Sequence, residues 1–466
     1  MTKYKKVKII ATLGPASENQ ETIESLINEG VDIFRFNLTH SNKEETVNRT
    51  KMIRKAEKKL GRPVSIMGDL GGPKIRTGEV AEERMLKVGD VLNILDNESK
   101  EENSITINFP EILKELAVGA EIYLGDGMPK LQVKKIIKNG VAAKVIVGGL
   151  LKSKMGFAAQ GLAIRSVKLS KRDSDFVKLM AELNIDSMAV SFVQSGKDIL
   201  EVKKLFPKGY APHVVAKIET LAGVKNIDEI LKEADGIMVA RGDLGFAVPM
   251  EELPLIQKQL IKLGMAHSKP VIVATQMLES MTNSHLPTRA EISDVANAIL
   301  DRTDAVMLSG ETARGKYPVE AVKVMTKIIN RMTDSIEPAE FKESKRVSDA
   351  MSASAVKIAD QVGAKLIIVF SETGASARRV SRHRNSQPII ALSPNKLTIH
   401  KLNFSWGVRA YFGPRVESFK AALPQAIKLA KDNPIMKLSK GEPFVICAGL
   451  SFGKAGTTNM VLVERV

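Results

Sequence analysis

The sequence contains a single cysteine, Cys447, among its 466 residues. One cysteine rules out a disulfide framework, and its position in the apolar run 443–448 favours a buried, inert thiol. The basic N-terminus lacks the apolar core of a secretory signal, and no run of about eighteen apolar residues occurs. We therefore expect no membrane-spanning helix and a reducing compartment, the cytoplasm.

Aromatic residues are also scarce, with one tryptophan and five tyrosines. They offer few platforms for stacking on bases, and neither an RNA-recognition signature nor zinc-ligand spacing is present. The Gly-Lys-Ser/Thr run of a P-loop is absent too. The net charge is nevertheless +16, from 69 Lys and Arg against 53 Asp and Glu, which favours an anionic partner. Nucleic acid is the weaker interpretation, and steep salt dependence of binding would reveal it.

Short apolar segments that end in a polar, charged or glycine residue recur along the chain and predict buried parallel strands. Stretches with helical spacing separate most of them. This alternation predicts an α/β fold, a (β/α)8 TIM barrel, whose functional end is formed by the carboxyl ends of the strands. The predicted strands are residues 7–12, 32–37, 64–69, 187–191, 214–219, 236–241, 271–275 and 305–309. The predicted helices are residues 19–28, 44–60, 174–183, 199–205, 227–234 and 255–268.

Two segments depart from this pattern. After strand three, residues 77–161 show glycine-rich turns and β-like alternation, which predicts an inserted small β-barrel lid domain on the functional face. Residues 338–466 are typical of a separate C-terminal α/β domain. The barrel is then built from residues 1–76 and 162–337. The C-terminal domain is expected to contain a helix at 348–362 and strands at 365–370, 388–392, 408–412 and 443–447.

Two carboxylates, Glu219 and Asp243, follow successive predicted strands. A barrel would bring both to one rim, where they could serve as oxygen ligands for Mg²⁺ or Mn²⁺. Lys217 precedes Glu219 by two residues and shares its strand face, so its ammonium could reach the reacting group. Solvated loop carboxylates and a plain salt bridge are the alternatives.

Polar residues alternate along residues 35–40. Arg35, Asn37 and Thr39 would point to one side of an extended segment, and a positive charge beside neutral oxygens suits phosphate and a monovalent cation. His40 on its own would more often be structural.

A constrained turn follows strand three at residues 71–76. It carries two cations, Lys74 and Arg76, in a position suited to a polyphosphate. Such turns are common in loops, so this signal is weak by itself.

Nine short motifs follow one another along the chain. They are residues 12–17 (TLGPAS), 35–40 (RFNLTH), 69–76 (DLGGPKIR), 216–219 (AKIE), 240–245 (ARGDLG), 274–281 (ATQMLESM), 291–298 (EISDVANA), 307–313 (MLSGETA) and 456–459 (GTTN). In this order, over nearly the whole length, they resemble the pyruvate kinase family. A set this large is highly specific.

The resemblance implies transfer of a phosphoryl group from phosphoenolpyruvate to ADP, giving pyruvate and ATP in the last step of glycolysis. It implies that Glu219 and Asp243 hold a divalent metal, Mg²⁺ or Mn²⁺. Lys217 and Arg35 would contact the transferring phosphoryl group. Thr275 would lie near the enolate that must be protonated.

The same resemblance implies the remaining ligand contacts and the assembly. The substrate carboxylate would lie on the backbone of Ala240, Arg241, Gly242 and Asp243. The nucleotide would face Thr12, Pro15, Asn37, His40 and Arg76. Family members are usually homotetramers, so we expect one here.

Lys74 departs from the family pattern, because many members carry Glu there and need K⁺. A fixed ammonium could supply the missing positive charge, so we predict activity without K⁺. The residues that resemble the ligands of that ion are Asn37, Thr39, Asp69 and Leu70. A solvent-facing Lys74 with K⁺ still required is the alternative.

The lid departs further. Gly125-Asp126-Gly127 stands where two acidic residues are usual, and Met155 stands where a lysine is common. Lys154 is the nearest substitute for that nucleotide-facing lysine, although a solvated surface lysine is the more frequent situation. We therefore expect reduced turnover or a different closure geometry.

Residues 371–376 follow an apolar strand and open a helix. Their hydroxyls and backbone amides suit a phosphate, and they resemble the loop where family members bind sugar-phosphate effectors. A helix-capping turn is an equal alternative. The loop comprises Ser371, Glu372, Thr373, Gly374, Ala375 and Ser376. The arginines beyond it, Arg378, Arg379, Arg382 and Arg384, fit either an anionic effector or a plain basic surface.

Two other functions fit parts of this pattern. A degenerate paralogue would bind the ligands but turn over poorly, which the altered lid favours. A barrel lyase or aldolase acting on pyruvate-like acids would share Lys217 and the carboxylates. The phosphate-facing groups of residues 35–40 and 72–76 argue against the lyase.

Overall fold

A closed barrel of eight parallel strands forms the centre of the chain. The computed structural model describes residues 4–72, 75–97, 103–125, 127–159, 170–341, 344–433, 435–450 and 456–466. The strands are β1 (Lys8–Thr12), β2 (Ile33–Asn37), β3 (Ser65–Leu70), β12 (Ser187–Val190), β13 (His213–Ile218), β14 (Gly236–Ala240), β15 (Val271–Ala274) and β16 (Ala305–Leu308). β1 pairs with β16 and closes the ring. The predicted TIM barrel and its eight strands are confirmed, with ends that differ by at most one residue.

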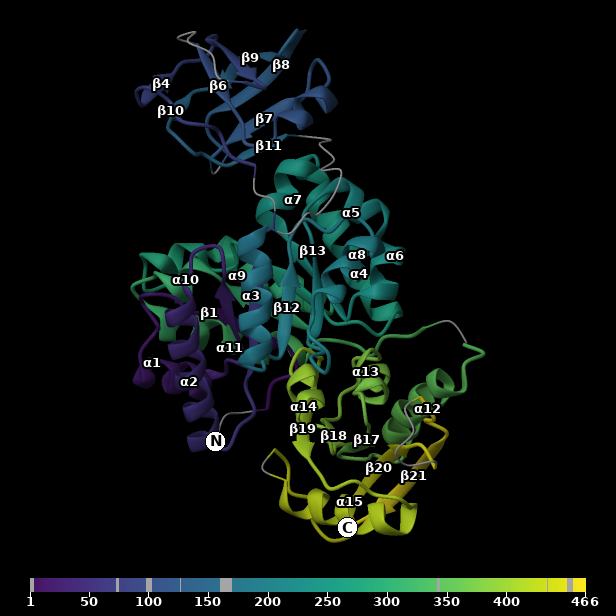
Figure 1. Cartoon of the computed structure of the whole chain (residues 1–466). Helices are drawn as coiled ribbons and strands as arrows, with labels where there is room; N and C mark the ends of the chain where they lie inside the picture. The colour runs from purple at the N-terminus through teal and green to yellow at the C-terminus, as the bar shows by residue number, and fades with distance from the viewer. Residues whose placement is uncertain are drawn as a thin grey trace.

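Helices surround the barrel (Figure 1). Local capping fixes their ends: α2 begins with a capping box between Asn42 and Glu45 and ends at Gly61, which has a left-handed conformation. The helices are α1 (Gln20–Glu29), α2 (Lys43–Leu60), α3 (Lys171–Glu182), α4 (Gly196–Lys204), α5 (Leu221–Lys225), α6 (Ile227–Glu233), α7 (Arg241–Ala247), α8 (Leu253–Ala266), α9 (Arg289–Leu300), α10 (Gly310–Ala313) and α11 (Pro318–Thr333). Short 3₁₀ turns, η2 (Met250–Glu252) and η3 (Glu279–Thr282), precede α8 and α9.

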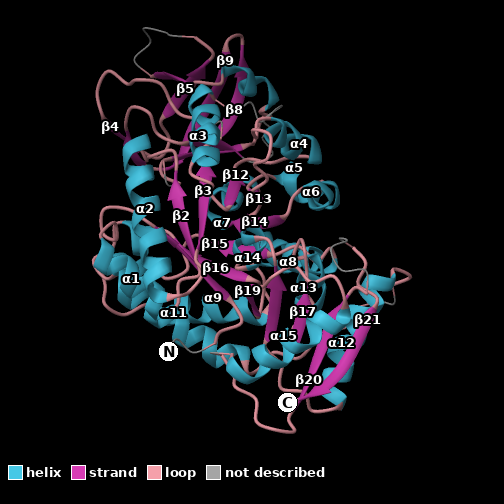
Figure 2. Cartoon of the chain, turned by 60° about the horizontal axis from the view of Figure 1, so that its bottom comes forward, coloured by secondary structure: helices cyan, strands magenta, loops and turns pink. Residues whose placement is uncertain are grey.

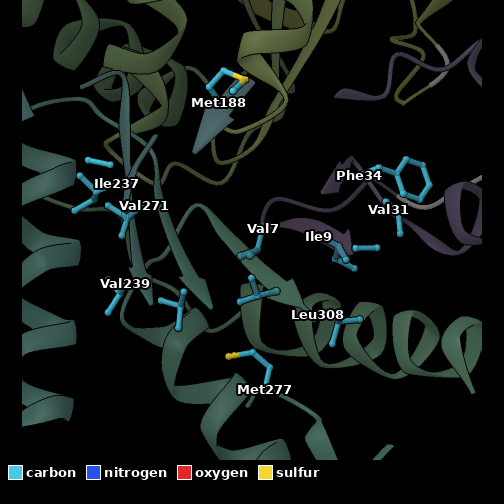
Figure 3. Packing of buried hydrophobic residues seen from close by; sticks show 14 of the residues in the cluster. Val7, Ile9, Val31, Phe34, Met188, Ile237, Val239, Val271, Met277 and Leu308 are labelled. Carbon is cyan, nitrogen blue, oxygen red and sulfur yellow. The ribbon is translucent and has the colours of Figure 1, made fainter. Parts of the chain in front are cut away.

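Alternation along the strands divides the barrel core into two layers. Ile9 belongs to the large cluster between strands and helices, part of which Figure 3 shows around Phe34 and Met277. Its neighbour Ile10 belongs instead to the cluster inside the barrel, together with Met67. Successive strand residues point to opposite faces, so a run that is apolar throughout fills both layers.

The inserted lid has its own apolar core, as the alternating burial in β7 and β8 requires. It is a curled six-stranded sheet of order β11-β7-β8-β9-β5-β6, with a separate pair of β4 and β10. The elements are β4 (Arg84–Leu86), β5 (Val91–Leu95), β6 (Ser104–Thr106), η1 (Pro110–Glu115), β7 (Glu121–Leu124), β8 (Lys130–Ile137), β9 (Gly140–Val147), β10 (Gly149–Leu151) and β11 (Phe157–Ala159). It lies beyond α7 at the top of Figure 1, where the rings of Tyr123 and Phe246 are 5.1 Å apart.

The C-terminal domain is built on a five-stranded sheet of order β19-β18-β17-β20-β21 (Figure 2). Its elements are α12 (Val347–Gln361), β17 (Ile367–Phe370), α13 (Ala375–Ser381), β18 (Ile389–Ser393), α14 (Lys396–Leu402), β19 (Val408–Phe412), α15 (Phe419–Asp432), β20 (Pro443–Ala448) and β21 (Met460–Arg465). β21 is antiparallel to β20 and was not predicted. Burial raises the pKa of the Cys447 thiol to about 12, as expected of an inert core residue.

The C-terminal domain covers the amino ends of the barrel strands. Lys8 Nζ donates to the Val408 carbonyl at 2.6 Å, and Ser65 Oγ donates to the His400 carbonyl at 2.7 Å. Phe404 joins the cluster inside the barrel and stacks on His213, with ring centroids 4.8 Å apart. The opposite end of the barrel is left for the functional groups. No helix among the described residues is long and apolar enough to cross a membrane.

A buried ion cluster at this covered end should contribute strongly to stability. Asp32 accepts from Lys5, from Arg62 Nη2 at 2.7 Å and from the Ile9 N–H at 3.0 Å. Burial alone would raise its pKa, but Lys5 and Arg62 hold it well below the usual range. Asp32→Asn leaves buried cations without a counter-charge, so we expect urea denaturation to show a loss of about 3–5 kcal/mol.

The pH dependence supplies the check on this prediction. A folded-state pKa below the unfolded value gives stability that is complete above about pH 4 and is lost as the pH falls. The variant should therefore be less sensitive to acid than the native chain. Glu83→Ala, which removes a surface contact to Lys152 at 3.9 Å, should cost less than about 1 kcal/mol. Equal losses in the two variants would contradict the account.

Candidate functional site

The Asp69 carboxylate binds two cations at the carboxyl ends of the barrel strands. Its Oδ2 accepts from Arg35 Nε at 2.7 Å, and its Oδ1 lies 3.3 Å from Lys217 Nζ. The barrel order places β3 between β2, which carries Arg35, and β12, with β13 next. Although burial alone would raise the pKa of Asp69, Lys217 and Arg35 lower it. The site therefore contains a carboxylate that stays ionised and holds both cations.

Lys217 is fixed by three neighbours. Its Nζ donates to Ser191 Oγ at 2.7 Å and lies 2.9 Å from Glu219 Oε1, besides its contact with Asp69. The Ser191 hydroxyl donates a hydrogen bond to the Leu70 carbonyl at 2.8 Å, so its oxygen is oriented towards the ammonium. Burial would lower the pKa of Lys217, but Asp69 and Glu219 outweigh burial and raise it. The ammonium is permanently charged in a buried position.

Glu219 and Asp243 come together at the same rim. Burial raises the pKa of Glu219 to about 7, with a further contribution from the negative charge of Asp243. Glu219 Oε2 accepts the Phe192 N–H at 2.7 Å, whereas its buried Oε1 has only the Lys217 ammonium, at 2.9 Å, as a partner among the described residues. A divalent cation would satisfy that oxygen and remove the repulsion between the carboxylates, so the two residues fit Mg²⁺ or Mn²⁺.

The described residues contain no group of three or more His, Cys, Asp or Glu that could hold a metal. Mg²⁺ commonly takes only one or two protein carboxylates and completes its shell with water and substrate oxygens. The pair is therefore suited to a metal that is shared with a phosphorylated substrate.

The Arg241 side chain holds the loop after β15 in place instead of pointing to the rim. Its guanidinium donates to the Thr275 carbonyl at 2.6 Å and to Asp294 Oδ1 at 2.7 Å. Thr275 and Gln276 have φ of +70° and +52°, a strained region for such residues. Thr275 Oγ1 accepts the Gly242 N–H at 2.8 Å. Thus only the backbone of Arg241 is available for the expected contact with a substrate carboxylate.

Of the residues near β1 and β2 that were predicted to bind ligands, some are buried in hydrogen bonds within the protein and others are exposed. Thr12 is buried, donating to the Leu308 carbonyl and accepting from Arg35 Nη1, each at 3.0 Å. Asn37 Oδ1 accepts the Thr39 N–H at 3.3 Å, which closes the turn before His40. Pro15 and His40 are exposed. Leu70 offers its carbonyl to Ser191, as described above.

The two lid departures contact one another. A Cβ at Gly125, whose φ is +61°, would lie 2.8 Å from Met155 Cε, and Met155 packs against the lid core. Arg76 Nη1 donates to the Lys154 carbonyl at 3.0 Å, and Lys154 Nζ pairs with Glu79 on the surface at 2.7 Å. Met155 thus takes an apolar role in the lid. Asp126 and Lys74 lie outside the described residues.

The loop of residues 371–376 lines a pocket in the C-terminal domain with Leu392, Pro414 and Thr458. Ser376 Oγ is 2.5 Å from Thr458 Oγ1, and the Glu372 carbonyl accepts from Thr398 Oγ1 at 2.8 Å. Gly374 has φ of +81° and begins α13. The loop therefore lines this pocket, and these hydrogen bonds fix its conformation. It belongs to the C-terminal domain and not to the barrel rim.

Three groups that contact the candidate site residues were not predicted from the sequence: the Ser191 hydroxyl, the Phe192 N–H and the Asp294 carboxylate. Ser191 and Phe192 follow β12, and Phe192 has a φ of +56°. A hydroxyl at a predicted strand end could have been singled out, because the other strand ends carry functional groups. The contact between Asp294 and Arg241 could not be predicted from their spacing, because only the tertiary fold brings them together.

The fold and this rim define a barrel enzyme that binds an anionic substrate with buried cations and a pair of carboxylates. Residues 4–322 match the family model for the pyruvate kinase barrel domain, and residues 349–464 match the model for the pyruvate kinase alpha/beta domain. The chain belongs to the pyruvate kinase family, and it is a phosphotransferase of that type.

Individual relatives agree over the whole length. The chain is 40% identical to pyruvate kinase from Geobacillus stearothermophilus over 99% of this chain and 80% of that protein. It is 36% identical to pyruvate kinase from Thermotoga maritima, over 98% of this chain and 99% of that protein. The crystal structure of a pyruvate kinase from Cryptosporidium parvum superposes with a TM-score of 0.91 at 33% identity, covering 99% of this chain and 96% of that one.

Loss of the Arg241 anchor should impair turnover without unfolding the barrel. In Arg241→Gln the guanidinium contacts to residues 275–277 are lost, which releases Thr275 from its strained conformation. A displacement of about 1 Å can reduce a rate about 10²-fold, and we expect a loss of that size in kcat. Pyruvate formation in a coupled assay measures it.

Arg289→Gln is the matched control, because Arg289 is exposed at the start of α9, the helix that carries Asp294. It removes the same charge and should leave kcat unchanged. If both variants behaved alike, the anchoring role of Arg241 would be wrong.

Proposed function

We propose that the chain transfers the phosphoryl group of phosphoenolpyruvate to ADP, giving pyruvate and ATP. One observation carries the proposal: Asp69 holds Arg35 and Lys217 beside the Glu219 and Asp243 carboxylates. In the reaction the bond between phosphorus and the enol oxygen breaks, a bond to the terminal oxygen of ADP forms, and the enolate takes up a proton. Fixed positive charge beside a moving phosphoryl group is what this chemistry needs.

The residues of the chain have distinct roles in this proposal. Arg35 binds the phosphoryl group, and the buried ammonium of Lys217 stabilises its charge during transfer. The backbone of residues 240–243 receives the substrate carboxylate, for which the Gly242 N–H would have to exchange its hydrogen bond to Thr275 Oγ1. Thr275, held by the Arg241 anchor, lies beside the enolate carbon that is protonated. A divalent cation, Mg²⁺ or Mn²⁺, on Glu219 and Asp243 supplies further charge stabilisation when bound.

We further propose that the enzyme needs no K⁺. The cations beside Asp69 are the side chains of Arg35 and Lys217. Lys74, which stands where many relatives carry Glu, would add a third protein cation. The oxygens of the monovalent-type site, from Asn37, Thr39, Asp69 and Leu70, would then be served by protein ammonium and guanidinium groups. The turn is tight at Gly71, because a Cβ there would lie 2.6 Å from Thr39 Oγ1.

Nucleotide handling and regulation complete the proposal. Thr12, Pro15, Asn37, His40, Arg76 and Lys154 are the candidate nucleotide contacts. Without an acidic residue at 125 and a lysine at 155, the lid should close less tightly on phosphates, which would reduce turnover. The pocket at residues 371–376 is the candidate site for a sugar-phosphate effector. A homotetramer in the cytoplasm is the assembly and location that we expect.

Removal of the Lys217 ammonium tests the reaction directly. Lys217→Ala should lower kcat for pyruvate formation from phosphoenolpyruvate and ADP, with Mg²⁺, by about 10³-fold. Lys225→Ala is a control, because Lys225 is an exposed lysine at the end of α5. No pyruvate from the native chain, with any effector, would favour the degenerate paralogue. Unchanged kcat in Lys217→Ala would refute the role of the lysine.

The monovalent-cation proposal has its own test. In buffers free of K⁺ and NH₄⁺ the native chain should retain full activity, and Lys74→Glu should restore dependence on K⁺. Titrating KCl at constant ionic strength measures both. An absolute K⁺ requirement in the native chain would contradict the proposal of K⁺ independence but not the proposed phosphoryl transfer.

A further inference from the structure

A second pocket lies between the C-terminal domain and the covered end of the barrel, at the other end of α13 from residues 371–376. Four cations line it: Lys269, Arg378, Arg382 and Arg384. Arg382 and Arg384 are only 8% and 2% exposed, so they do not form a plain basic surface. Buried like charges are unfavourable unless a counter-charge is near.

Asp304 is the only carboxylate among the described residues that line this pocket, and its oxygens are already used. Oδ2 accepts from Arg384 Nη2 at 2.8 Å and from the Val271 N–H at 3.0 Å, while Oδ1 accepts the Trp406 N–H at 2.9 Å. Asp304 therefore neutralises Arg384. No carboxylate of the pocket lining pairs with Lys269, Arg378 or Arg382; the negative charges that act on them, Asp235 on Lys269 and Arg378 and Asp349 on Arg382, lie outside the lining.

Hydrogen bonding in the pocket is incomplete as well. The nearest acceptors of Arg382 Nη1 are the Ala266 carbonyl and Ser268 Oγ, both at a long 3.3 Å. Its buried Nε has no hydrogen-bond partner among the described residues, and neither does Ser405 Oγ, whose residue is 1% exposed. Buried polar atoms in native proteins nearly always have partners, so Arg382 and Ser405 offer this pocket unused hydrogen-bonding capacity for acceptor oxygens.

We propose that this interdomain pocket binds a phosphate group, either as inorganic phosphate or as the phosphate of a small metabolite. A tetrahedral oxyanion accepts several charge-assisted hydrogen bonds at once, which suits guanidinium groups converging with an ammonium and a hydroxyl. Bound there, it would tie α13 to the barrel loop at residues 266–270. The site is separate from the proposed catalytic rim, and its test needs no activity.

Arg378 connects this pocket with the loop at the other end of α13. Its Nη1 approaches the Thr373 carbonyl at 3.4 Å, and a Cβ at Gly374 would lie 2.9 Å from the same nitrogen. An anion in the interdomain pocket would compete for Arg378. The test must therefore separate the two pockets.

Trp406 provides a local reporter, because it is the one tryptophan of the chain. It is 1% exposed, and the Arg384 guanidinium lies over its ring, 5.0 Å from the centroid. We would titrate the purified full chain with sodium phosphate, and separately with glycerol 3-phosphate, at constant ionic strength, and record Trp406 fluorescence. A saturable change is expected with at least one probe, and the tighter probe identifies the source of the phosphate.

Three variants locate the response. Arg382→Gln should weaken the apparent affinity about tenfold or more, as expected for loss of a charge-assisted contact. Arg379→Gln removes a charge from the same helix but faces Asp349, at 3.1 Å, and should bind as the native chain does. Ser376→Ala alters the loop at the far end of α13 and should also retain the response.

If Arg382→Gln fails to fold, Ser405→Ala serves in its place, since it removes only the unpartnered hydroxyl and should weaken binding severalfold. A change that sodium chloride reproduces would overturn the proposal. So would a change that survives in both Arg382→Gln and Ser405→Ala, or one that disappears in Ser376→Ala alone.

Discussion

The ionised carboxylate of Asp69 is the constraint on which the rim of the barrel depends. Arg35 and Lys217 would repel one another and lose hydration if they were buried at one place without it. With Asp69 between them, both cations are fixed at the carboxyl ends of the strands, and Lys217 in turn contacts Glu219. Ser191 adds a neutral hydrogen bond that sets the direction of the ammonium.

The two ends of the barrel differ in how fully their charged groups are paired. At the covered end, Phe404 fills the interior and buried pairs such as Arg384 and Asp304 satisfy the charges that the C-terminal domain encloses. At the rim, charges are left incompletely satisfied, and strain is retained at Phe192, Thr275 and Gln276. Such residues are stable only because the surrounding strands and the Arg241 anchor hold them, which is common where a ligand must be met by preset groups.

Much of the fold was predictable because parallel strands buried on both faces are short and mostly apolar, and the eight barrel strands have this character apart from a few polar residues. β21 was missed because its pattern, Met460–Arg465, mixes apolar and charged residues at the edge of a sheet. The carboxyl ends of the predicted strands also pointed to Lys217 and Glu219, which the structure brings together.

Side-chain direction was harder to predict than position. Arg241 was expected to meet the substrate through its backbone, and no role was predicted for its guanidinium, which binds Asp294, 53 residues along the chain. Arg382 and Arg384 were open to interpretation as surface charge, but an interface between domains buries them. In each case the partner comes from a distant element, so spacing along the sequence carries no signal for the contact. The contact of Gly125 with Met155 likewise explains two lid departures as one packing change.

The most direct test of the central claim is the kcat of Asp69→Asn for phosphoryl transfer from phosphoenolpyruvate to ADP, with far-UV circular dichroism to verify the fold. The substitution keeps the shape but removes the charge that holds Arg35 and Lys217. We predict a loss of about 10²-fold or more, with the secondary structure intact. A folded variant whose kcat equals that of the native chain would contradict the account.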